Sequence, residues 1–255
     1  MTSVAFHLPV LIASWVLLAA GSAAGGTVYW NMSDLSAPTL KTVSNLAVGA
    51  IGQGNTTTTG TASTSSSSGY TFFLAETSTP ASGGANLTFA AKHGVLSTAS
   101  SSYMAVTFTP SIGSTGTVTG IGFASRSTSS GPTTLSLRSS NDAFAAEIAG
   151  FTTSTTSTWA YFTQTFSTPL IIDSGSSLEL RLYGSGGSSA NGGNWRLDDL
   201  QFDALVVPEP ATLLLGLVGA VGLMTAGFRL GNLTRRDTTR CAEHKPGSAS
   251  SSCSS

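Results

Sequence analysis

Few side chains in this sequence have both the type and the spacing that metal binding or catalysis requires. Asp198, Asp199 and Asp203 form its one acidic cluster, and carboxylate oxygens of this kind are ligands that calcium accepts in proteins. Strand alternation would send Asp198 and Asp199 to opposite faces, and such carboxylates are equally typical of solvent-facing strand positions. The three residues are therefore calcium candidates, and no other metal site is predicted.

Nucleophilic catalysis by serine is not predicted, because a serine nucleophile needs a base beside it. His93 is the one histidine away from the two ends of the chain, and it stands between Lys92 and Gly94 as a turn residue would. Neither a Gly-x-Ser-x-Gly elbow nor a phosphate-binding loop occurs in the required context. If the protein were an enzyme, its catalysis would have to use carboxylates alone, for instance Glu179 or Asp199. A non-enzymatic protein without a cofactor is the expectation.

Aromatic residues in the second half of the chain have the chemistry of a sugar-binding surface. Aromatic rings offer an apolar face on which a sugar ring can stack, and tyrosine and tryptophan add a polar group at the edge. Core packing or an exposed strand face would explain the same residues equally well. The carbohydrate-binding candidates are Trp159, Tyr161, Tyr183 and Trp195.

Composition narrows the remaining function classes. The 255 residues allow one folded domain with targeting segments, and charged residues make up only 9% of the chain. Residues 25–207 contain six basic and nine acidic residues, with no basic patch dense enough to follow a phosphate backbone, so nucleic-acid binding is disfavoured. Both cysteines, Cys241 and Cys253, lie in the tail. The domain itself therefore has no disulfide.

These candidate residues lie in a region with the pattern of a β domain. Residues 25–206 alternate short β-type runs with Gly- and Ser-rich breaks, and 55–69 is almost wholly Thr, Ser and Gly, as in a flexible loop. The pattern predicts an all-β fold, an antiparallel, jelly-roll-like β-sandwich. Alternation is clearest at 178–183, where three leucines would face inward. The expected strands are 70–74, 86–90, 103–108, 117–123, 133–138, 159–166, 177–183 and 194–206.

An apolar segment near the N-terminus predicts export. Residues 8–20 form an apolar run that is followed by the small residues 21–24, as in a signal peptide cleaved after Ala23 or Ala24. Residues 1–24 are therefore predicted to be a signal peptide. The alternative is an uncleaved N-terminal membrane helix, because no Lys or Arg precedes the apolar run.

A second apolar segment, 211–228, contains eighteen residues without a charge. At about 1.5 Å per residue it reaches about 27 Å, which approaches the hydrocarbon thickness of a bilayer. Arg229, Arg235 and Arg236 follow it, as at the cytoplasmic end of a membrane helix. A single transmembrane helix is predicted, with a buried core helix as the alternative, and 237–255 is predicted to be a disordered cytoplasmic tail.

A proline-flanked acid stands directly before this segment. Pro208 and Pro210 hold the chain around Glu209 extended, although proline also suits the first positions of a helix. With the apolar segment and the basic flank, residues 207–236 resemble the PEP-CTERM sorting signal of exported Gram-negative bacterial proteins. The resemblance implies that Pro208, Glu209 and Pro210 are recognised by a membrane-embedded exosortase, which is thought to cleave there and to transfer the protein to the cell surface or into exopolysaccharide.

Two hypotheses follow for the β domain. The first is a structural or adhesive protein of the cell surface or extracellular matrix, exported and held at the cell envelope by the C-terminal signal. The second is an envelope-anchored module that binds exopolysaccharide through the aromatic residues. Residues 180–184 and 195–200 are similar to the closing strands of jelly-roll carbohydrate-binding modules and of the central domains of many PEP-CTERM proteins. This similarity implies an architecture and leaves both hypotheses open.

Overall fold

The structure is a computed structural model that describes residues 25–56, 61–62, 85–91, 94–188 and 193–209. The predicted signal peptide, the strand at 70–74, His93, Pro210, the apolar segment 211–228 and the tail lie outside these residues. Among the described residues, no helix has the length and apolar character needed to span a bilayer. The chain divides into two compact units after Glu209, and the β domain belongs to the first.

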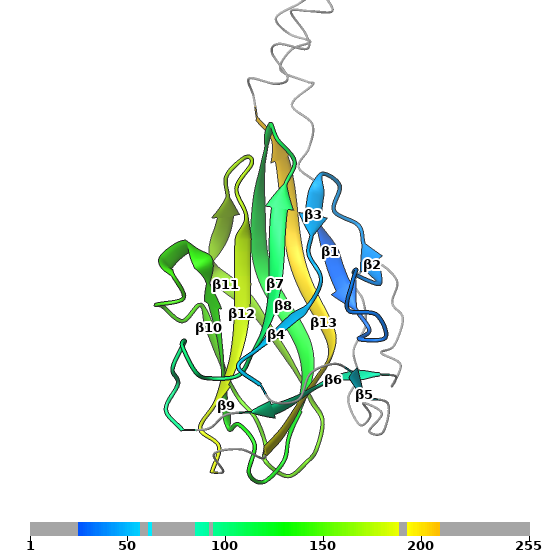
Figure 1. Ribbon diagram of the computed structural model, residues 1–255. Coiled ribbons are helices and arrows are strands. Elements are labelled where there is room, and N and C mark those ends of the chain that lie inside the picture. Colours follow the sequence, from blue (N-terminus) through cyan, green and yellow to red (C-terminus); the bar gives the residue numbers. More distant parts are fainter. Residues whose placement is uncertain (1–24, 57–60, 63–84, 92–93, 189–192, 210–255) are drawn as a thin grey trace, which may run out of the picture. The chain divides into compact units, whose positions relative to one another are not determined.

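The described residues of this unit form two antiparallel sheets that pack face to face (Figure 1), so the predicted β-sandwich is confirmed. The first sheet has the order β11-β8-β13-β1-β2, with β6 on β13 and β5 on β6; the second has the order β10-β9-β12-β7-β3, with β4 on β7. The strands are β1 (Gly25–Trp30), β2 (Leu40–Lys41), β3 (Leu46–Val48), β4 (Gly52–Gly54), β5 (Thr61–Ala62), β6 (Asn86–Ala91), β7 (Tyr103–Pro110), β8 (Ser114–Ser127), β9 (Thr134–Ser139), β10 (Ala149–Thr152), β11 (Ala160–Ile172), β12 (Leu178–Ser185) and β13 (Gly193–Pro208), and a 3-10 turn, η1 (Ser140–Asp142), follows β9.

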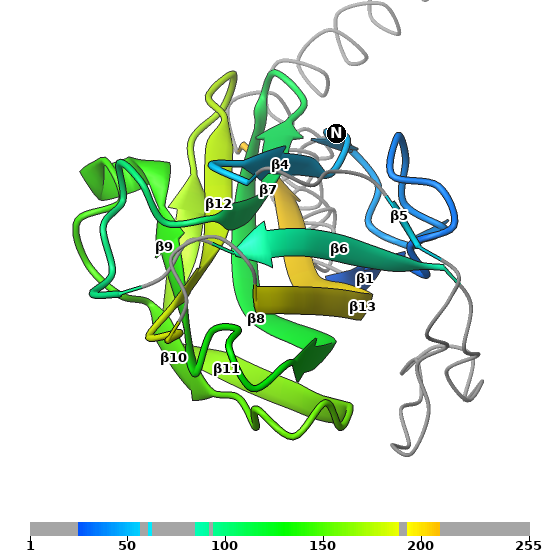
Figure 2. The ribbon, with the colours of Figure 1, turned by 60° about the horizontal axis from the view of Figure 1, so that its bottom comes forward.

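The long strand β13 organises the first sheet. One edge pairs with β8 along nearly its whole length. The other edge pairs first with β6 and then with β1, so β6 and β1 follow one another along β13 (Figure 2). Because β1 and β13 come from opposite ends of the domain, this pairing closes the sheet with contacts of long sequence separation.

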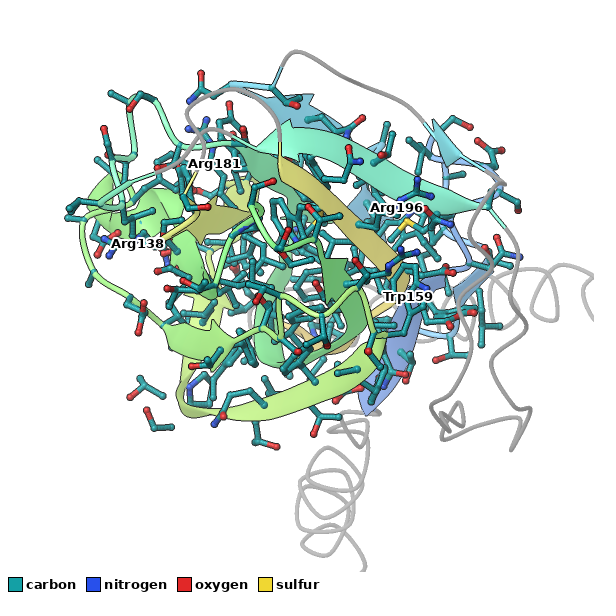
Figure 3. The ribbon with its side chains drawn as sticks, turned by 90° about the horizontal axis from the view of Figure 1, so that it is seen from below. Arg138, Trp159, Arg181 and Arg196 are labelled. Atoms are coloured by element: carbon teal, nitrogen blue, oxygen red, sulfur yellow. The ribbon has the colours of Figure 1, made fainter. Side chains whose placement is uncertain are left out.

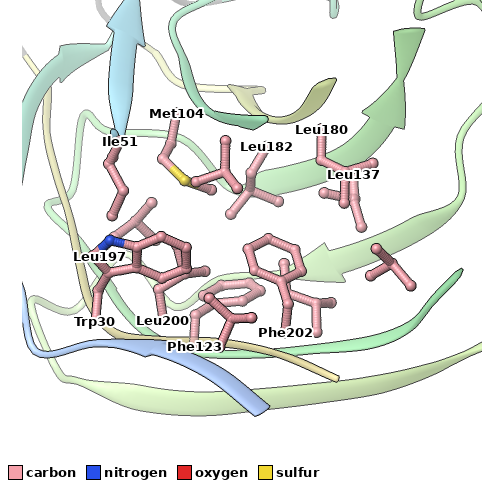
Figure 4. Packing of buried hydrophobic residues seen from close by; sticks show 14 of the residues in the cluster. Trp30, Ile51, Met104, Phe123, Leu137, Leu180, Leu182, Leu197, Leu200 and Phe202 are labelled. Atoms are coloured by element: carbon pink, nitrogen blue, oxygen red, sulfur yellow. The ribbon is translucent and has the colours of Figure 1, made fainter. Parts of the chain in front are cut away.

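The core lies between the sheets and is built by strand alternation. The inward side chains of β12 are Leu178, Leu180 and Leu182, all fully buried, as the sequence predicts. Leu180 and Leu182 face residues such as Leu200 and Phe202 of β13 (Figure 4). Each fully buried side chain of this size contributes about 1.5 to 3 kcal/mol by leaving water, so the two facing rows are a main source of stability.

Candidate functional site

The outer face of the first sheet, along β8 and β13, carries a concentration of polar and aromatic side chains. On β13 the inward positions belong to Leu197, Leu200 and Phe202, so the residues between them face outward. We call this surface the β8–β13 face. It comprises Tyr29 of β1, Arg126 of β8, Tyr161, Thr163 and Thr165 of β11, and Arg196, Asp198, Asp199, Gln201 and Asp203 of β13.

A β-bulge in β13 shapes the centre of this face. The register against β8 shifts between Asp198 and Gln201. Asp199 has a φ of +47°, in the left-handed region, as is common at a β-bulge. The extra residue lets Leu197 and Leu200 both point into the core. The sequence-based prediction that Asp198 and Asp199 lie on opposite faces is therefore wrong, because alternation is interrupted between them.

Both carboxylates are fully buried and take part in hydrogen bonds at the bulge. Asp198 Oδ1 accepts the backbone N–H of Asp199 at 2.8 Å. Asp199 Oδ1 accepts the hydroxyl of Tyr29, 170 residues away in sequence, at 2.5 Å. The side chain of Asp199 is thereby fixed between β13 and β1.

The two tyrosines of the face are held in their protonated form. Burial raises the pKa of Tyr29 well above its usual value of 10.0, and the hydrogen bond to Asp199 and the negative charges of Asp199 and Asp198 raise it further. Burial also raises the pKa of Tyr161, with further contributions from Asp199 and Asp203. Both phenols are therefore hydrogen-bond donors across the physiological range.

Small residues on β8 leave room for side chains to lean over this strand. A Cβ atom added at Gly122 would lie 2.3 Å from the hydroxyl oxygen of Tyr161. One added at Gly120 would lie 3.1 Å from the carbonyl oxygen of Gln164 and 3.3 Å from a carboxylate oxygen of Asp203. The glycines thus allow β11 and β13 to bring their polar groups together above β8.

Polar groups at the open part of the face are available for binding. Thr163, Thr165 and Asp203 are exposed. Gln201 Nε2 donates to Asp203 Oδ1 at 3.0 Å, whereas Gln201 Oε1 is buried and has no hydrogen-bond partner among the described residues. Hydroxyl, amide and carboxylate groups side by side can donate to and accept from a ligand rich in hydroxyl groups.

The structure does not bring the four predicted aromatic residues together. Trp195 is fully buried in the core, where it stacks on Phe89 at 4.3 Å and donates to Ser125 Oγ at 3.1 Å. Tyr183 is also fully buried and belongs to β12 in the other sheet. The predicted four-ring platform is therefore wrong for these two residues, whose rings are enclosed by packing. Tyr161 is half-buried on the β8–β13 face, and Trp159 precedes β11 with 7% of its surface exposed.

The calcium candidates are also separated in their roles. Asp198 and Asp199 are buried at the bulge, whereas Asp203 is exposed and bound to Gln201. Across the described residues, no group of three or more His, Cys, Asp or Glu side chains is placed to hold a metal ion. Glu179, the other carboxylate considered for catalysis, pairs with Arg181 at 2.6 Å on the second sheet.

Sequence reasoning missed Tyr29, Gln201, Arg126 and Arg196 as members of this face. Tyr29 reaches Asp199 because β1 pairs with β13, and no local sequence pattern predicts a pairing between strands so far apart in the chain. A local signal did exist in β8, where Gly120 and Gly122 alternate with core residues inside a strand, since glycine there often marks close approach of another group.

The start of the predicted sorting signal is part of the folded domain. Pro208 is the last residue of β13 and pairs with Ser114. The backbone N–H of Glu209 donates to the carbonyl oxygen of Gly113 at 2.9 Å. The tripeptide therefore begins inside the last strand, whereas the sequence reading ended the β domain at residue 206.

Comparison with known proteins identifies no family. No family model matches the chain, and no curated protein matches it either. Among solved structures, it is similar to a C-terminal family 6 carbohydrate-binding module of a laminarinase from Zobellia galactanivorans, with 15% identity, a TM-score of 0.31, and 70% of this chain and 98% of that one covered.

Two further structures show a similar degree of likeness. A mutant family 29 carbohydrate-binding module in complex with mannohexaose has 11% identity and a TM-score of 0.34 over 72% of this chain and 93% of its own. A cyclase from Fischerella sp. has 12% identity and a TM-score of 0.34, with 72% of this chain and 98% of that one covered. Values this low carry no argument about function, which must rest on the residues of the site.

Proposed function

We propose that this protein is a non-catalytic polysaccharide-binding module and that the β8–β13 face is its binding surface. The observation that carries the proposal is the row of Tyr161, Thr163, Gln201 and Asp203 side chains beside the glycines of β8. A sugar ring has an apolar C–H face and a rim of hydroxyl groups. A half-buried tyrosine ring matches the first, and hydroxyl, amide and carboxylate groups match the second.

A binding role suits this face better than a catalytic one. A general acid or base must reach the reacting atoms of the substrate. Asp198 and Asp199 are fully buried, and Asp199 is engaged by Tyr29. Asp203, the exposed carboxylate of the face, accepts a hydrogen bond from Gln201 and is suited to hold a hydroxyl group.

Native electrophoresis through gels that contain polysaccharide would test this proposal. We expect retardation of the wild-type protein, and we expect Tyr161→Ala to weaken it about three- to tenfold, because the ring and its contacts are lost. Tyr161→Phe keeps the ring and is expected to keep most of the retardation. Tyr103→Ala, on the opposite sheet, is the matched control.

Two results would count against the proposal. Wild-type protein that migrates equally in gels with and without each of a panel of polysaccharides would remove the binding function. Equal retardation of wild type and Tyr161→Ala, with both variants folded by circular dichroism, would move the binding site away from the β8–β13 face.

We also propose that the protein is exported to the cell envelope and sorted by its C-terminal segment. Support comes from the order of the tripeptide at 208–210, the apolar segment 211–228 and the basic residues after it. Pro208 is the last residue of β13, and Glu209 is the last residue of the first compact unit. The processing partner would be an exosortase-type enzyme in the membrane.

The mass of the mature protein from envelope fractions would test the sorting proposal. We expect wild-type chains to end near residues 207–210 and Glu209→Ala chains to keep their full C-terminus. Wild-type chains that retain 211–255 would indicate a plain membrane anchor and would contradict sorting. Polysaccharide binding by the β domain does not depend on this outcome.

A further inference from the structure

Two arginines on the β8–β13 face lie directly opposite one another. Arg126 of β8 and Arg196 of β13 are register partners, and both are half-buried. Like charges at directly opposed positions of a sheet repel one another. Burial and the charge of Arg126 together lower the pKa of Arg196. The pair is therefore electrostatically unfavourable in the protein alone.

The protein does little to neutralise this pair. Arg196 donates from Nη1 to the amide oxygen of Asn86 at 3.0 Å, which is a neutral acceptor. The side chain of Arg126 has no hydrogen bond or ion pair among the described residues, and its Nε is buried without an acceptor. The nearest carboxylate along β13 on this face, Asp198, accepts the N–H of Asp199 within the bulge.

A second opposed pair, on the other sheet, shows how the same arrangement is satisfied internally. Arg138 of β9 and Arg181 of β12 are also register partners. Arg181 pairs with Glu179 at 2.6 Å and its guanidinium lies 4.4 Å from the ring centre of Tyr103. Arg138 donates to Ser136 Oγ and to the carbonyl oxygens of Phe144 and Ala145. Figure 3 shows Arg138 and Arg181 on one side of the domain and Arg196 on the other.

We propose that Arg126 and Arg196 form an anion subsite that binds an acidic substituent, a carboxylate or a sulfate ester, of the polysaccharide. The inference rests on the proposed function and narrows its ligand to acidic polysaccharides. Guanidinium groups bind such anions through paired N–H donors, and an anion between the two arginines would replace their repulsion with two attractive contacts. Trp159 precedes β11, the strand whose first residue, Ala160, pairs with Ser125 beside Arg126.

The described residues carry more acidic than basic side chains, so a general attraction to polyanions is not expected. Binding should instead depend on these two positions. The test compares retardation in gels of unmodified dextran, dextran sulfate and polygalacturonate for the wild type, Arg126→Gln and Arg196→Gln. Lys41→Gln, which also removes one positive charge, is the control, since Lys41 lies on the edge strand β2.

We expect one of the two acidic polymers to bind the wild type roughly tenfold more tightly than dextran, since a charge-assisted hydrogen bond is worth about that factor. Which acidic polymer binds identifies carboxylate or sulfate as the substituent. Each arginine variant should reduce this binding to the dextran level, and Lys41→Gln should not. Because the Arg126 side chain has no hydrogen-bond or ion-pair partner to lose in the part of the chain that the structure describes, Arg126→Gln should fold and melt no lower than the wild type.

Each remaining outcome overturns a defined claim. Equal binding of the wild type to dextran and to both acidic polymers would refute the anion subsite but would leave the proposed polysaccharide-binding function standing. Unchanged acidic binding by Arg126→Gln and Arg196→Gln would refute these residues as the site. No retardation of the wild type by any polymer would instead contradict the proposed function itself.

Discussion

Tyr29→Phe should destabilise the domain by removing the hydroxyl that joins β1 to the bulge in β13. The hydroxyl donates to Asp199 Oδ1 at 2.5 Å, and both residues are buried. A hydrogen bond to a carboxylate contributes about 1.5 to 3 kcal/mol, and its loss leaves the buried carboxylate short of a donor. At about 2 to 4 °C for each kcal/mol in a domain of this size, the melting temperature should fall by roughly 3 to 12 °C.

The same contact predicts a specific loss of stability at high pH. The folded state keeps Tyr29 protonated above pH 10.0, where the unfolded chain ionises, because its pKa is raised in the folded protein. This stabilisation is full below pH 10 and is lost as the pH rises further, by about 1.4 kcal/mol per pH unit for each such tyrosine. Tyr161 contributes in the same sense. Above pH 10, Tyr29→Phe should therefore reduce by about half the slope with which the free energy of unfolding falls with pH.

Urea unfolding of the isolated β domain, followed by tryptophan fluorescence between pH 7 and pH 11, measures both effects. Tyr103→Phe is the matched control, because the Tyr103 hydroxyl donates no hydrogen bond to any of the described residues, and it should change stability by no more than about 0.5 kcal/mol. A Tyr29→Phe variant as stable as this control at pH 7, with an unchanged slope above pH 10, would refute the reasoning. A double-mutant cycle with Asp199→Asn would isolate the pairwise energy.

Two further substitutions test the packing that positions the site. Trp195→Ala should cost about 3 to 5 kcal/mol in urea unfolding, because the ring is fully buried and stacked on Phe89; a loss below 1 kcal/mol would contradict its place in the core. Gly122→Ala should cost about 1 to 3 kcal/mol, because the new methyl group would meet the Tyr161 hydroxyl. Gly25→Ala, with the nearest atom 3.9 Å away, is its control and should melt like the wild type.

Much of the fold could be predicted from local alternation. Seven of the eight expected strands lie in the described residues, and each corresponds to an observed strand. Strand β1 was missed because Gly25–Trp30 begins with two glycines and follows directly on the predicted signal peptide. Strand β10 was missed because its four residues include Gly150, which weakens the pattern. Short strands of this kind are fixed by their partners, which a single run of sequence does not contain.

The candidate site was harder to predict because residue type does not decide exposure. Trp195 and Tyr161 are similar in chemistry, yet Trp195 points into the core and Tyr161 points outward. Their orientations follow from the register of β13 and β11 against β8, which depends on long-range pairing. An aromatic residue in a strand is therefore a candidate for either role until its face is known.

The bulge at Asp199 explains why strand alternation in the sequence does not predict the centre of the site. A one-residue insertion leaves Leu197 and Leu200 both facing the core, and it turns two neighbouring carboxylates toward the same side. Burial of those carboxylates is tolerable only with donors in place, and the Asp199 backbone and Tyr29 supply them. The core thus requires the bulge, and the bulge requires β1. The carboxylates at the centre of the polar surface are thus held by the same strand pairing that builds the core beneath them, and side chains fixed in this way lose less conformational entropy when a ligand binds.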